Sequence, residues 1–229
     1  MNGRKKLRSF DIIAMTQQSR FNYVPMSCAI LTFVLHAAII FNGEFVWDDR
    51  AAVLSNPDVL GQRSLLDLVS YDFWGQDMAL EVTSTLVFDF ALAHTLPISF
   101  SLCMHYHQIS HKSWRPATVI SLRLSHNLYG AKASGFHFDN VFIHAIITYC
   151  YAVLCFQLTT NYIGECNMAR RAAVLTSIMF AVHPIHTEPV ASIVGRSDLL
   201  CGLFFVVSIT LYRIGRNEMN HYSMSHWQY

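Results

Sequence analysis

The chain has 229 residues, of which 53% are hydrophobic and only 14% are charged. Ordinary soluble domains carry about 25% charged residues, so this composition argues against a soluble domain and favours a protein that resides in a membrane. The net charge of +1 gives no indication of a nucleic-acid partner. The six cysteines fall mostly within apolar runs and are typical of small core residues rather than of a disulfide framework.

The first predicted element is a membrane-spanning helix over residues 23–41, because about 20 apolar residues are needed to cross a bilayer. A basic cluster precedes it, so the positive-inside rule predicts that residues 1–22 stay cytoplasmic. A cleaved signal peptide is the alternative. The apolar run is longer than the h-region of about 7–15 residues that a signal peptide carries, and no small-residue cleavage site follows it. The cluster consists of Arg4, Lys5, Lys6, Arg8 and Arg20.

Two adjacent carboxylates, Asp48 and Asp49, follow this span directly after Trp47. They are therefore predicted at the membrane surface on the side away from the basic cluster. Carboxylates held at that level beside an aromatic anchor indicate chemistry on a substrate that lives in the bilayer.

A long extramembrane loop, residues 42–137, is predicted next. Ser64 and Asp67 have the spacing of a capping box, and Trp114-Arg115-Pro116 marks the start of a further helix. Its apolar positions Ile120, Leu124 and Leu128 recur every four residues. That pattern suits either a helix in the interface plane or a loop helix packed on protein.

Three further spans are predicted, over residues 141–158, 172–182 and 199–212, although the last two are short. With an even alternation, the basic pairs Arg170-Arg171 and Arg213/Arg216 fall on the cytoplasmic side. The nearly apolar segment 86–104 contains Asp89, which would be costly at mid-bilayer, and we expect it not to span.

Six short strings, read in order, resemble the transmembrane and tetratricopeptide repeat-containing proteins, which are endoplasmic-reticulum O-mannosyltransferases of the GT-C fold. The resemblance covers residues 21–78 and 110–212. Residues 79–109 have no counterpart in the family, which also continues past the position of Tyr229 with more helices and tetratricopeptide repeats. The strings are Trp47-Asp48-Asp49, Asp72-Phe73-Trp74-Gly75, Ser110 to Pro116, Gly135-Phe136-His137, Phe180 to Glu188, and Ser192 to Leu200.

The resemblance implies an all-α membrane protein, the N-terminal part of a GT-C-type bundle with about four transmembrane helices and a long first lumenal loop. Residues 23–212 would form a truncated membrane domain and residues 213–229 a C-terminal tail. The implied activity is transfer of mannose from dolichyl phosphate mannose to Ser or Thr hydroxyls of proteins, with no resident cofactor. The chain would be a multi-pass protein of the endoplasmic-reticulum membrane. The alternative is a non-catalytic membrane fragment that lacks a complete donor site.

The same resemblance assigns candidate roles. An acceptor hydroxyl needs a base, for which Asp48 is slightly favoured over Asp49. The departing phosphate needs cations: the candidates are Lys112, Arg115 and Arg196, with His111 weaker.

A turn holding His183, His186 and Glu188 is expected near the donor head group. A metal site there is the less favoured interpretation, because the spacing lacks the helical i, i+4 geometry of zinc motifs. Haem ligation by His36 and His144 stays open as a different class of function.

Overall fold

The structure, a computed structural model, describes residues 23–79, 112–163 and 166–226. These residues form two compact units, one of residues 23–44 with 132–226 and one of residues 45–79 with 112–131. The basic N-terminus, His111 and all but the first residue of the atypical segment 79–109 lie outside the described residues.

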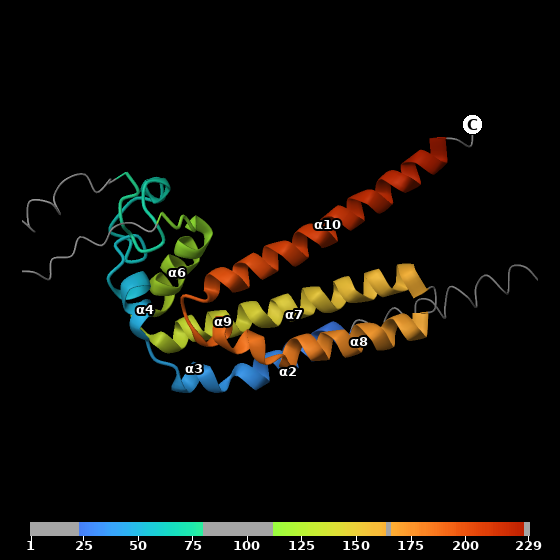
Figure 1. The fold of residues 1–229 in the computed structure, drawn as a ribbon, viewed down its shortest axis with the longest axis horizontal. Coiled ribbons are helices and arrows are strands. Elements are labelled where there is room, and N and C mark those ends of the chain that lie inside the picture. Colours follow the sequence, from blue (N-terminus) through green and yellow to red (C-terminus); the bar gives the residue numbers. More distant parts are fainter. Residues whose placement is uncertain (1–22, 80–111, 164–165, 227–229) are drawn as a thin grey trace, which may run out of the picture. The chain divides into compact units, whose positions relative to one another are not determined.

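The first unit is built from helices, as the apolar runs predict (Figure 1). No β-strand occurs in the described part of the chain, so the prediction of an all-α membrane protein is confirmed. The elements are α2 (Tyr23–His36), α3 (Ala38–Asn42), α7 (Ala133–Ile163), α8 (Cys166–Val182), the 3-10 helix η3 (Pro184–His186), α9 (Thr187–Ala191) and α10 (Arg196–His226).

Three helical segments of this unit are long and apolar enough to cross a membrane: Tyr23–Asn42, Ala133–Thr159 and Arg196–Arg216. They contain the first, second and fourth predicted spans. Helix α8 has 17 residues, or about 25 Å at 1.5 Å per residue, which is short of a bilayer core of about 30 Å. The third predicted span, residues 172–182 within α8, therefore stays a prediction.

Helix α7 is the centre of this unit. Thr32 of α2 donates a hydrogen bond to Thr148 of α7 over 3.2 Å, and both residues are buried. Further along α7, Thr159 donates to the Ala169 carbonyl of α8, where buried Ala169 and Ala173 leave room for close helix contact. Hydroxyl pairs and small residues thus join α2 and α8 to α7. One apolar cluster combines Val141, Ile147, Val190 and Leu199.

The second unit consists of short helical elements connected by loops, together with one longer helix. It contains α4 (Trp47–Asp49), the π-helical turn η1 (Arg50–Leu54), the 3-10 turn η2 (Asp67–Val69) and α6 (Pro116–Tyr129). The backbone N–H of Ser64 donates to Asp67 Oδ2 over 3.0 Å, which is half of the predicted capping box. Helix α6 begins at Pro116, so that helix start is confirmed.

Candidate active-site residues

In the short helix α4, one of the two adjacent carboxylates is buried and the other is exposed. The Asp49 carboxylate is buried, and its Oδ2 accepts a hydrogen bond from the backbone N–H of Val46 over 3.1 Å. Asp48 is exposed, because neighbouring side chains on a helix diverge by about 100°. Asp49 therefore fixes the turn that follows the first span, while Asp48 is the carboxylate that a substrate can reach.

Two of the predicted cations belong to the same unit as Asp48. Lys112 and Arg115 are both exposed, and Lys112 has a left-handed backbone with φ of 53°. The segment between them is fixed by the Phe73 N–H, which donates to the Ser113 carbonyl over 2.8 Å. The Arg115 guanidinium carbon lies 5.2 Å from the centroid of the Phe73 ring. Both cations are thus held by a folded loop at the surface of the unit.

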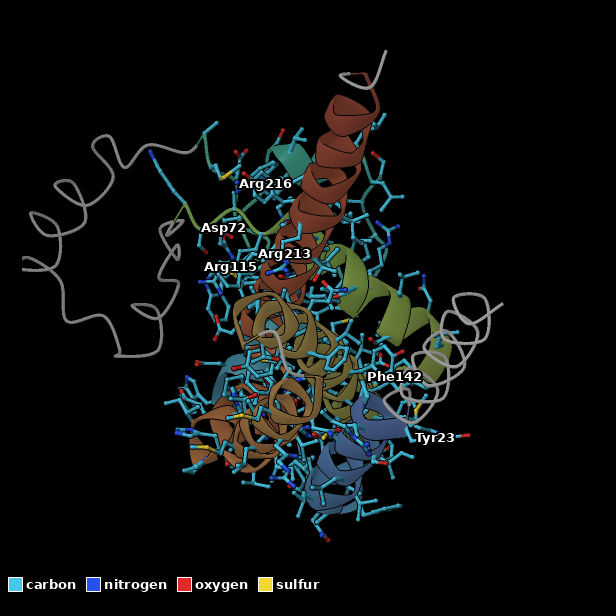
Figure 2. The ribbon with its side chains drawn as sticks, turned by 90° about the vertical axis from the view of Figure 1, so that its right-hand side faces the viewer. Tyr23, Asp72, Arg115, Phe142, Arg213 and Arg216 are labelled. Carbon is cyan, nitrogen blue, oxygen red and sulfur yellow. The ribbon has the colours of Figure 1, made fainter. Side chains whose placement is uncertain are left out.

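The Asp72-Phe73-Trp74-Gly75 string folds this loop. Asp72 Oδ1 accepts from the backbone N–H groups of Trp74 and Gln76, each over 2.9 Å, which is an Asx-type turn (Asp72 and Arg115 are labelled in Figure 2). Phe73 is buried and Trp74 is half-buried. The placement of Trp74 in an interfacial aromatic belt, or against a sugar, stays a prediction.

An ion pair between a buried carboxylate and a partly exposed guanidinium in the same unit has no signal in the sequence. Asp58 is 1% exposed, and its Oδ2 lies 3.2 Å from Arg63 Nη1, which also donates to the Gly75 carbonyl over 3.0 Å. The Arg63 guanidinium carbon sits 3.6 Å from the Tyr71 ring centroid. Burial raises the pKa of Asp58 above its usual range, and the Arg63 charge opposes that shift. The partners are brought together only by the folded loop, so spacing along the chain does not reveal them.

Arg196, the third predicted cation, is buried at the start of α10. Its Nε donates to Asn140 Oδ1 over 2.8 Å, and its Nη2 donates to the Phe136 carbonyl over 2.9 Å. The same Nη2 lies 3.8 Å from Asp139 Oδ2. These contacts join α10 to the first turns of α7. A role of Arg196 at the donor phosphate stays a prediction.

Imidazole rings from the segment between α8 and α10 lie close to imidazole rings from α7 and α2. The centroids of His183 and His186 are 6.0 Å apart, and His186 lies 4.9 Å from His144 of α7. His144 in turn meets His36 of α2 edge to face at 5.1 Å. Two rings in direct edge contact leave no porphyrin plane between them, which argues against haem ligation by this pair. Glu188 is exposed on α9.

The described residues contain no group of three or more His, Cys, Asp or Glu side chains placed to hold a metal ion. Burial lowers the pKa of His186, and repulsion from His183 and His36 adds to the shift. A neutral imidazole can donate or accept one hydrogen bond through each nitrogen. Sequence reasoning linked His183 with His186, whereas their proximity to His144 and His36 arises only from helix packing.

An apolar groove of about 480 Å³ runs between α2 and α7 within the first unit. Phe142, labelled in Figure 2, is one of its lining residues and stacks on Phe138, which meets Phe33 edge to face. Its lining is completed by Met26, Ala29, Ile30, Ala145, Ile146 and Tyr149.

Comparison with known proteins identifies relatives for most of the chain. It is 34% identical over 200 residues to the human protein O-mannosyl-transferase TMTC4. The aligned region covers 85% of this chain and 23% of the relative. It is 33% identical over 186 residues to the Drosophila melanogaster protein O-mannosyl-transferase Tmtc1, covering 81% of this chain and 18% of the relative. For the human protein O-mannosyl-transferase TMTC3 the identity is 32% over 176 residues, covering 77% and 15%.

No family model matches the chain, and no solved structure matches it. The chain spans about a fifth of the length of the first of these curated relatives.

Proposed function

Because this chain is homologous to the protein O-mannosyl-transferases, which confirms the family resemblance in its motifs, we propose that it is part of an enzyme that transfers mannose to protein. The donor is dolichyl phosphate mannose and the acceptor is a Ser or Thr hydroxyl. The reaction takes place on the lumenal side of the endoplasmic-reticulum membrane, and the N-terminus is cytoplasmic. A non-catalytic membrane fragment is the competing function, since the chain covers 23% of TMTC4.

One structural observation supports the proposal most directly. The exposed carboxylate of Asp48 lies six residues beyond Asn42, where the first membrane-spanning segment ends. A lipid-linked sugar presents its reactive bond at the same level, because its tail is anchored in the bilayer. A hydroxyl is a poor nucleophile, and a positioned base accelerates its attack by about 10²–10⁴-fold. Asp48 is the member of the pair that can take that proton.

The other candidates take distinct parts in the proposal. Lys112 and Arg115 are exposed cations of the unit that carries Asp48, and they would stabilise charge on the departing phosphate. His183, His186 and Glu188 would face the donor head group. Arg196 would act indirectly, since its guanidinium is already bonded to α7.

The donor can be tested with a longer polypeptide, in which this chain is followed by the C-terminal region of the relative TMTC4. It is purified from membranes and given an acceptor protein rich in Ser and Thr. Labelled dolichyl phosphate mannose should yield alkali-labile mannosyl protein, whereas the soluble donor GDP-mannose should not. Transfer from GDP-mannose alone would contradict the lipid-linked donor. Absence of transfer from both, by folded protein, would favour the fragment function.

The orientation is tested separately in sealed microsomes. A cysteine at position 48 or 187 should be protected from a membrane-impermeant thiol reagent, and a cysteine at position 171 should react. Ready reaction at 187 would contradict the proposed topology.

A further inference from the structure

Helix α6 has two unlike faces, and only one of them is covered by the unit to which it belongs. Thr118, Val119, Leu122 and Ser125 are buried on one side of the helix. On the other side an apolar stripe, Ile120, Leu124 and Leu128, has exposed fractions of 40%, 57% and 73%.

The exposed face carries no charge. Besides the apolar stripe it includes Ala117 and Asn127, both exposed and both uncharged. The nearest charged side chain, Arg123, is turned towards the protein, where its Nη1 donates to the Arg63 carbonyl over 2.9 Å. Surface helices in water normally present charged or polar residues outwards, so a wholly uncharged outer face indicates a different surrounding.

The short link between α6 and α7 indicates that the uncharged face lies near the membrane. Three residues separate the end of α6 at Tyr129 from Ala133, the first residue of a membrane-spanning segment. Four extended steps reach at most about 14 Å, so the end of α6 stays close to the start of α7. The exposure of the stripe also increases along α6 towards this tethered end, from Ile120 to Leu128.

The other end of the unit is tethered in the same way. Four residues separate Asn42, at the end of the first span, from Trp47, whose side chain is 90% exposed. Tryptophan is enriched at the level of lipid head groups. The two short links that join this unit to the apolar helices, residues 43–46 and 130–132, thus hold it at the surface of the bilayer.

We propose that α6 lies in the plane of the membrane interface with the apolar stripe inserted between lipid head groups and acyl chains. The partner is the lipid surface of the bilayer that the flanking helices cross. The inference does not depend on the reaction that the protein catalyses. Its consequence is that residues 45–79 and 112–131 are docked on the membrane by their own surface as well as tethered by the flanking chain.

The test uses the whole chain in phosphatidylcholine vesicles that contain phosphatidylcholine with a diazirine on the first carbons of an acyl chain. After illumination, trypsin releases residues 124–132, which carry Leu124 and Leu128, and residues 51–63 from the same unit as an internal control. The first peptide should carry lipid adducts and the second should stay at background. Equal background in both peptides would overturn the proposal, and so would cross-linking of the stripe to protein instead of lipid.

A matched pair of variants excludes labelling by chance encounter. The double variant Leu124→Ser with Leu128→Ser should lose the adducts on residues 124–132, with helix content by circular dichroism unchanged. Asn127→Ser changes an exposed polar residue of the same peptide and should keep them. Undiminished labelling of the folded double variant would show that the apolar stripe is not the contact.

Discussion

Replacing Arg196 by methionine tests how the start of α10 is anchored to α7. The guanidinium is 1% exposed and makes two short hydrogen bonds, to the Asn140 side chain and to the Phe136 carbonyl, with Asp139 at 3.8 Å. Methionine keeps much of the buried volume and removes every donor. Asn140 Oδ1 is then left buried with its Arg196 bond lost.

The magnitude follows from these contacts. A hydrogen bond to a charged group contributes about 1.5–3 kcal/mol. We take the lower value for each of the two bonds, since methionine also removes the cost of burying a charge. The expected loss in the free energy of unfolding is then about 3 kcal/mol. For a chain of this size that loss corresponds to a decrease in melting temperature of about 6–12 °C.

Unfolding can be followed in detergent with a thiol-reactive dye, because Cys28 and Cys155 are free and buried in the folded protein. Arg216→Met is the matched control, since Arg216 is exposed on the same helix and should melt within about 2 °C of the wild type. If Arg196→Met melted together with this control, the buried contacts would contribute nothing and the anchoring account would be refuted.

Two other predictions concern the segment between α8 and α10. Gly195→Ala should lower the melting temperature, because a Cβ there would lie 2.6 Å from the Pro189 carbonyl oxygen, whereas Gly202→Ala, with open space around it, should be neutral or stabilising by up to about 1 kcal/mol; equal melting of the two variants would contradict the close approach. His186 has a pKa lowered by burial and by His183, so the folded state takes up its proton less readily than the unfolded state. The stability it contributes is present above the unfolded value of 6.5 and is lost as the pH falls towards the lower folded value. Melting curves between about pH 7.5 and 5.5 should therefore show a decrease in stability that His186→Gln reduces, and an unchanged decrease in that variant would remove His186 as its cause.

Hydropathy predicted three spans that fall within long apolar helices, but it placed the start of the second span too late. The second span was expected from about residue 141, whereas α7 begins at Ala133. Its first turns contain buried polar residues such as His137 and Asn140, which a hydropathy pattern excludes and tertiary contacts accommodate. Asn140 is bonded to Arg196, 56 residues away along the chain. No local pattern carries that information.

For the candidate site, too, the sequence predicts which residues matter, whereas their burial depends on tertiary contacts. Motif order drew attention to Asp48, Asp49 and Arg196, but the sequence could not say which of them is buried. That distinction depends on a hydrogen bond to Val46 and on helix packing around α7. Likewise, the sequence pairs His36 with His144 only as candidate haem ligands. Folding instead brings both rings into one cluster with His186.

The most direct test of the proposed mannosyl transfer compares Asp48→Asn with Asp49→Asn in the longer polypeptide, with dolichyl phosphate mannose as donor. Asparagine keeps the size of the side chain but cannot take a proton. Asp48→Asn should abolish transfer and leave the melting temperature unchanged, because Asp48 is exposed. Asp49→Asn should lower the melting temperature and impair transfer through the turn at Val46. Full activity of a folded Asp48→Asn protein would contradict the assignment of Asp48 as the base.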